Sequence, residues 1–165
     1  MSAYVVDTNV PIVANGQADH ADIDCVLNSI SMLKKLRKQG RILLDDHLRM
    51  LDEYARHLSR SGQPGPGDAF LKWVWENQAN PLHCRTVAIT PKKGDPEDFE
   101  EFPNDPCLSS FDRSDRKFVA VAMASQDNPE IVNATDTDWW DHKVALERHG
   151  LRVRFLCPEL MAARR

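Results

Sequence analysis

The sequence predicts an α/β fold with three layers, in which helices flank a mostly parallel sheet of four to five strands. Short apolar runs typical of buried strands alternate along the chain with longer segments whose apolar residues recur every three or four positions. This alternation is typical of strand–helix units whose strands lie parallel. A chain of 165 residues can fill one core but is short for two ordinary domains, so we expect a single domain over residues 1–165.

The first half of the chain contains two expected strands, each leading into a helix. Residues 3–6 form an apolar run, and residues 7–9 supply turn and helix-capping side chains after it. Residues 22–39 carry apolar side chains along one helical face, and Gly40 follows as a stop signal. A second strand over residues 42–44 precedes a helix marked by Leu48, Leu51, Ala55 and Leu58.

The middle of the chain is less regular. The prolines and glycines of residues 61–67 indicate a loop, and residues 68–80 form a helix with apolar residues on more than one face. Trp73 fits a place in the core. Trp75 is either a core residue or an exposed ring for stacking or for contact with a second copy in a homodimer. Residues 91–110, rich in proline and acids, are expected to form an ordered loop or a mobile flap with solvated carboxylates.

The remaining apolar segments complete the alternation. Glycine 150 ends the last expected helix, and the final strand alternates apolar and basic residues. The expected elements are strands at 85–89, 130–133 and 151–156 and helices at 114–125 and 138–149.

Four acidic positions, far apart in the chain, each follow or open an apolar segment. They are Asp7, the Asp52-Glu53 pair, Asp115 and Asp136. The carboxyl ends of parallel strands share one edge of the sheet, where open α/β folds bind their ligands, so these carboxylates are expected to converge there. Clustered carboxylates repel one another, and a hard divalent cation such as Mg²⁺ or Mn²⁺ relieves that repulsion. The pattern therefore predicts metal-assisted hydrolysis.

The net charge of the chain does not indicate a nucleic-acid-binding protein. Its formal net charge is −4, whereas nucleic-acid-binding domains usually carry a basic face. Local clusters of basic residues matter more for this question than the net charge of the whole chain. Lys34 and Lys35 belong to one basic cluster, and Arg116 and Lys117 belong to another beside Asp115; both are candidates for holding phosphates. For the first cluster, a solvated helix face is the preferred alternative.

The cysteines and the hydropathy pattern bear on the cellular compartment of the protein. Cys25, Cys84, Cys107 and Cys157 show no CxxC spacing, and no apolar stretch resembles a signal segment or is long enough to cross a bilayer. We therefore expect a cytoplasmic protein with reduced thiols and no membrane partner.

Four segments resemble, in order, the acidic motifs of PIN-domain nucleases. They are Val5-Val6-Asp7-Thr8-Asn9-Val10, Asp52-Glu53-Tyr54, Ser114-Asp115-Arg116-Lys117-Phe118-Val119-Ala120 and Thr135-Asp136-Thr137-Asp138-Trp139. The resemblance covers nearly the whole chain and rests on the order of the motifs, not on any single one. It implies a parallel sheet flanked by helices and Mg²⁺- or Mn²⁺-dependent cleavage of a phosphodiester, usually in RNA. Many small stand-alone members are bacterial toxins, so it also implies an antitoxin or another regulatory protein as a partner.

The resemblance assigns roles to individual residues. Asp7 would be the first metal ligand, with Asn9 as the polar residue that orients it. Asp115 would be the third acid and Asp136 the fourth. Asp138 matches the position where the family often has a further acid, followed by an aromatic residue, and it would join the metal ligands.

The second acid is ambiguous between two neighbours. The family motif favours Glu53, directly before Tyr54. At roughly 100° per residue, however, Glu53 points almost opposite the apolar stripe of its helix, whereas Asp52 lies nearer the edge of that stripe. We prefer Glu53 on the motif and keep Asp52 as the alternative. Asp112, three residues before Asp115, is either an extra ligand or, as we prefer, a helix N-cap.

These observations favour a metal-dependent endoribonuclease that acts through Asp7, Glu53, Asp115 and Asp136. A DNA-directed nuclease and a non-catalytic binding or scaffold protein that keeps the fold are the alternatives. A phosphatase with an acidic Mg²⁺ pocket would usually need an Asp-x-Asp after the first strand, and here Asn9 occupies the second place.

Overall fold

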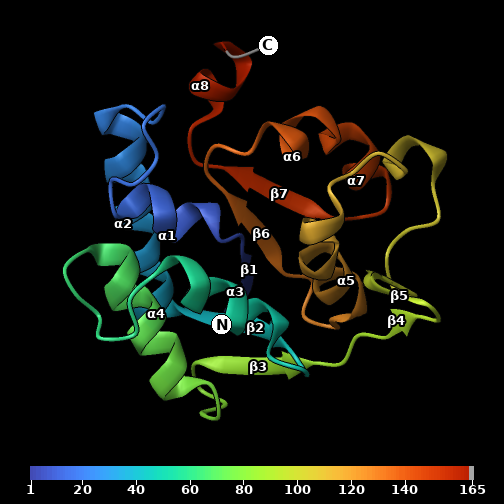
Figure 1. Cartoon of the computed structure of the whole chain (residues 1–165), viewed down its shortest axis with the longest axis horizontal. Coiled ribbons are helices and arrows are strands. Elements are labelled where there is room, and N and C mark those ends of the chain that lie inside the picture. The colour runs from blue at the N-terminus through green and yellow to red at the C-terminus, as the bar shows by residue number, and fades with distance from the viewer. Residues whose placement is uncertain (164–165) are drawn as a thin grey trace.

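A computed structural model of the chain, which describes residues 1–163, shows a five-stranded parallel sheet flanked by helices (Figure 1). The strand order is β3-β2-β1-β6-β7, and all four strand pairs are parallel. The predicted α/β class with three layers is confirmed. The strands are β1 (Ser2–Val6), β2 (Gly40–Asp45), β3 (Cys84–Val87), β6 (Glu130–Asn133) and β7 (Arg152–Phe155).

The helices form layers on both sides of this sheet. On one side, α1 (Asn9–Ala14), α2 (Ile23–Gln39) and α4 (Pro66–Asn77) pack against one another. On the other, α5 (Arg116–Ala124) packs on the central strands beside α3 (Arg49–His57). The central strands are buried on both faces, which explains why they read as continuous apolar runs and not as alternating ones. The remaining helices are α6 (Thr137–Asp141), α7 (Lys143–Arg148) and α8 (Pro158–Ala163).

The order of the strands reverses direction between β1 and β6. From β1 the chain moves outward to β2 and β3, and it later continues on the opposite side of β1 through β6 and β7. Adjacent parallel strands whose connections leave in opposite directions open a crevice at their carboxyl ends. Val6 pairs with Val132 at this point, and the Asp7 N–H donates to the Val132 carbonyl at 3.0 Å. The fold therefore places Asp7 beside the end of β6.

Several short elements differ from the sequence prediction. Helix α1 was expected only as a turn, since six residues are too few to display a helical period. The expected helix over 138–149 is two helices, α6 and α7, which meet at His142. Residues 91–110, expected to be a loop or flap, contain an antiparallel hairpin of β4 (Pro91–Lys92) and β5 (Asp95–Phe99) and a 3-10 turn. Helix α8 was not predicted.

The expectation of reduced thiols is wrong for two of the four cysteines. Cys25 of α2 and Cys157, which follows β7, form a disulfide across 132 residues. Such a long-range pair leaves no signal in cysteine spacing, because the fold alone brings the two segments together. Cys84 is buried and Cys107 exposed, both as free thiols, and burial raises the pKa of the Cys84 thiol to about 11. None of the helices among residues 1–163 is both long and apolar enough to cross a membrane.

A glycine at the start of α4 allows close contact with α1. A Cβ atom at Gly67 would lie 2.0 Å from the carbonyl oxygen of Pro11, which is backbone and cannot rotate away. At the same place the Asn15 side chain accepts hydrogen bonds from the N–H groups of Gly67 at 2.6 Å and Asp68 at 3.2 Å, which caps α4 from α1.

We expect Gly67→Ala to lower the free energy of unfolding by about 1 to 3 kcal/mol, because the two helices must move apart. Urea unfolding followed by circular dichroism measures this change. Lys72→Ala, at an exposed position on the same helix, is the matched control and should stay within about 0.5 kcal/mol of the parent protein. Equal stability of Gly67→Ala and the control would contradict the close contact.

Candidate metal centre

Three aspartates from distant parts of the chain meet beside the carboxyl ends of β1 and β6. Asp7 follows β1, Asp115 lies in a 3-10 turn directly before α5, and Asp136 follows β6 and caps α6. One carboxylate oxygen of each lies within 4.8 Å of the others. Asp7 and Asp115 are only 3% and 7% exposed. The structure thus brings together three of the acids that the sequence singled out.

Backbone and amide groups hold these carboxylates in place. The Asn9 N–H donates to Asp7 Oδ1 at 3.1 Å, and the Asn133 side-chain amide donates to Asp7 Oδ2 at 3.2 Å. Asn133 also accepts from the Asp136 N–H at 3.2 Å, so it connects two of the three acids. Sequence reasoning missed Asn133. The available signal was a polar residue that ends an apolar strand, three positions before Asp136.

Burial and mutual repulsion keep these acids from ionising easily. Burial, together with Asp136 and Glu53 nearby, raises the pKa of Asp7 to about 8. Burial and the neighbouring Asp7 and Asp136 raise the pKa of Asp115 to about 10. Burial raises the pKa of Asp136 as well, although the Asp138 N–H that donates to it acts in the opposite direction. Asp7 and Asp115 therefore hold protons at neutral pH unless a positive charge is supplied.

The donor set fits a hard divalent cation. It consists of carboxylate oxygens, which Mg²⁺ and Mn²⁺ prefer, and it contains no thiolate or imidazole. Among residues 1–163, no lysine, arginine or histidine forms an ion pair with any of the three aspartates. A cation bound between them would remove the repulsion that raises their pKa values.

Glu53 lies beside the three aspartates but is already paired within the protein. Its Oε1 accepts from the Lys117 ammonium at 2.7 Å, and its Oε2 accepts from the Thr8 hydroxyl. Glu53 is close enough to Asp7 to raise the pKa of Asp7, yet it does not belong to the group of three. The neighbouring Tyr54 donates its hydroxyl to the Val6 carbonyl and so fixes this helix against the end of β1.

Contrary to the helical-face prediction, Asp52 does not lie nearer the buried side of α3 than Glu53 does. Glu53 is buried and Asp52 is exposed. The predicted stripe left out Met50 and Tyr54, whose side of α3 also carries Glu53, and it included Leu48 and Leu58, which lie just outside the helix. The side chains that α3 buries are Met50, Leu51, Glu53 and Tyr54.

Asn9, Asp112 and Asp138 support the loops around the site. The Asn9 side-chain oxygen accepts from the N–H groups of residues 134 and 135, at 2.8 and 3.3 Å, which fixes the loop before Asp136. Its amide nitrogen is buried with no hydrogen-bond partner. Asp112 caps the turn before α5 by accepting from Ser114, as preferred from the sequence. Asp138 accepts from the Asp112 N–H at 2.7 Å and lies outside the group of three, although it was expected to join the ligands.

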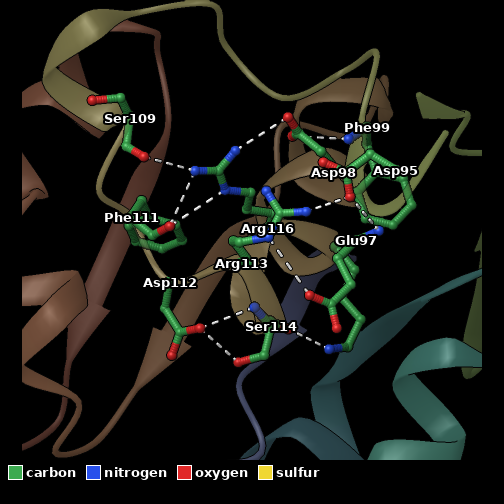
Figure 2. A network of polar contacts seen from close by, with 11 residues as sticks. Asp95, Glu97, Asp98, Phe99, Ser109, Phe111, Asp112, Arg113, Ser114 and Arg116 are labelled. Atoms are coloured by element: carbon green, nitrogen blue, oxygen red, sulfur yellow. Dashed lines mark hydrogen bonds and ion pairs between the residues drawn. The ribbon is translucent and has the colours of Figure 1, made fainter. Parts of the chain in front are cut away.

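Arg116 and Lys117 do not form the exposed basic cluster that the sequence suggested. Arg116 is buried, donates to the carbonyls of Ser109 and Phe111, and pairs with Asp98 of β5 at 3.2 Å (Figure 2). Lys117 is buried against Glu53 and the Ser114 carbonyl. Neither side chain is therefore available as a surface contact to phosphate. Lys34 and Lys35 are exposed on α2, as a solvated helix face would be.

A pocket with basic side chains opens next to Glu53. It has a volume of about 270 Å³ and lies between α3, the β4–β5 hairpin and the turn before α5. Arg113 on that turn pairs with Asp95 and Glu97, which ties the hairpin to the rim of the pocket (Figure 2). The charged residues that line the pocket are Arg49, Asp52, Glu53, Arg56, Glu97, Arg113 and Lys117.

Comparisons of this chain with protein-family models, with curated proteins and with solved structures found no match.

Proposed function

We propose that this protein is a PIN-like, Mg²⁺- or Mn²⁺-dependent endonuclease that hydrolyses phosphodiester bonds in RNA. The observation that carries the proposal is the group of Asp7, Asp115 and Asp136 at the carboxyl edge of a parallel sheet, three largely buried carboxylates that form no ion pair with any cationic side chain within residues 1–163. Ligand sites of open α/β folds lie at this edge. The order of the acidic motifs along the chain supports the PIN-like assignment.

The chemistry follows from the donor set. A divalent cation held by the three aspartates would polarise the scissile phosphate and lower the pKa of a bound water. The chain's own contribution is positional. Asn133 and the Asn9 N–H fix the two oxygens of Asp7, and the Asp138 N–H fixes Asp136. No histidine is required as a general base in this scheme.

The pocket beside Glu53 is the natural place for the nucleic-acid backbone. Arg56 lines it with a side chain that is 66% exposed, and Arg49 lines it while lying over the Phe99 ring, 5.3 Å from its centroid. Arg56, and not Arg116, presents an exposed guanidinium group in this pocket beside Glu53, whereas Arg49 is also paired with Asp45. Arg56 thus offers a local positive charge in a chain whose net charge is negative.

A cleavage assay tests the proposal. The purified chain is incubated with a mixture of single-stranded RNA and DNA oligonucleotides in Mg²⁺, Mn²⁺ or EDTA. Cleavage of RNA that needs a divalent cation supports the proposal, whereas cleavage of DNA alone changes the substrate class. No cleavage of either by a folded protein would favour the non-catalytic alternative.

We expect Arg56→Ala to weaken RNA binding about fivefold and to reduce the slope of log K against log salt by about 0.7, because one phosphate contact is lost. Binding is measured by fluorescence anisotropy in EDTA, which prevents cleavage. The double variant Lys34→Ala, Lys35→Ala is the comparison and should leave the slope unchanged. If the double variant lowers the slope and Arg56→Ala leaves it unchanged, RNA binds on α2 and not at the pocket beside Glu53.

A further inference from the structure

Glu53 differs from the three aspartates because protein donors occupy both of its oxygens. The Thr8 hydroxyl reaches one oxygen and the Lys117 ammonium reaches the other at 2.7 Å. Both charged side chains are only 11% exposed, so water screens this ion pair weakly. The aspartates, by contrast, are held by neutral N–H and amide groups.

The position of Lys117 is fixed by the same turn that carries Asp115. Its ammonium also donates to the Ser114 carbonyl, directly before Asp115 in the chain. The ammonium therefore lies against Glu53 and against the turn that carries Asp115, without forming an ion pair with any of the three aspartates.

Nucleases with two metal ions hold them about 3.5 to 4 Å apart and need a carboxylate free to serve the second ion. In this chain Glu53 is the neighbouring carboxylate that could serve a second ion, and it already forms an ion pair with the Lys117 ammonium. A second divalent ion beside Glu53 would meet the lysine ammonium at close range, and two positive charges in a buried setting repel strongly.

We propose that the Lys117 ammonium takes the place of a second divalent cation, so that the site binds a single metal ion through Asp7, Asp115 and Asp136. This inference rests on the proposed function and specifies it. Lys117 is a positioning residue: it holds Glu53 and supplies a fixed positive charge. Glu53, the second acid of the motif, is then a partner of Lys117 and not a metal ligand.

The test counts bound ions and does not depend on activity. Mn²⁺ is titrated into the full-length chain by calorimetry, and free Mn²⁺ is followed by electron paramagnetic resonance. The wild-type chain should bind one ion. Lys117→Met keeps the length of the side chain but removes its charge, leaves Glu53 with only the Thr8 hydroxyl and the more distant Arg56 guanidinium as partners, and should bind two ions. Adding Glu53→Gln to that variant should return the count to one. Lys72→Met, at an exposed position on α4, is the control for loss of a lysine and should bind one ion.

Two ions in the wild-type chain, or one ion in folded Lys117→Met, would overturn the inference and leave the proposed nuclease function standing. No bound ion in the wild-type chain would overturn both.

A second variant keeps the inference testable if Lys117→Met does not fold. Glu53→Gln alone should still bind one Mn²⁺, with an affinity less than about tenfold weaker, because only a neighbouring charge is lost. Asp52→Asn is its matched control on the same helix. A loss of tenfold or more in Glu53→Gln, absent from the control, would make Glu53 a ligand and overturn the inference.

Discussion

Asp115→Asn should reduce phosphodiester cleavage by about a thousandfold or more while leaving the protein folded. The substitution removes one of the three carboxylates that would hold the proposed cation, together with its charge. An asparagine at this position keeps the shape of the carboxyl group and can donate to Asp136, as a protonated Asp115 does. The loss therefore reflects metal binding and not packing. Initial rates on a labelled RNA in Mg²⁺ measure it.

Asp7→Asn and Asp136→Asn should give losses of similar size, because all three acids serve the same ion. Asp24→Asn, at an exposed position on α2, is the control and should retain full activity. Wild-type rates in Asp115→Asn would exclude this cluster as the active site, even if the chain proved to be a nuclease.

The second large effect concerns stability without metal. In EDTA, the free energy of unfolding of the wild-type chain should fall as the pH rises from about 6 to about 9. The pKa of Asp7 is raised to about 8 and that of Asp115 to about 10 in the folded chain, because both are buried beside other acids. A raised pKa contributes stability that is fully present below the unfolded value, near 3.8, and is lost as the pH rises through the folded value.

Asp115→Asn should therefore be more stable than the wild-type chain in EDTA at about pH 9, by about 1 to 3 kcal/mol, and the difference should shrink at about pH 6. Mg²⁺ should stabilise the wild-type chain at the higher pH and have little effect on the variant, since only the former binds it well. Urea unfolding at both pH values, with and without Mg²⁺, measures these differences. A wild-type stability in EDTA that does not change with pH would contradict the buried, repelling carboxylates.

The acids at strand ends were the most predictable part of the site. Their positions follow from two local rules: buried parallel strands read as apolar runs, and the ends of such strands share one edge of the sheet. Asp7 and Asp136 could be placed together for this reason, and the N-cap role of Asp112 could be read from its distance to the next helix.

The pairing within the site was not predictable, because it depends on where distant side chains meet. Lys117 lies 64 residues from Glu53, and nothing in either segment marks them as partners. The disulfide between Cys25 and Cys157 is hidden for the same reason. The error at Asp52 had a local cause, because the predicted apolar stripe left out Met50 and Tyr54, and the side of α3 that carries them also buries Glu53.

The separation of Asp7 and Asp136 along the chain has a consequence for biosynthesis. These two residues become neighbours only when β6 pairs with β1, and β6 comprises residues 130–133. A growing polypeptide that has reached the end of α5 already contains Asp7, Glu53 and Asp115, but it lacks the strand and the loop that complete the ligand set. The three carboxylates can therefore meet only after residue 136 has been made, so a polypeptide that stops short of this point carries an incomplete candidate centre.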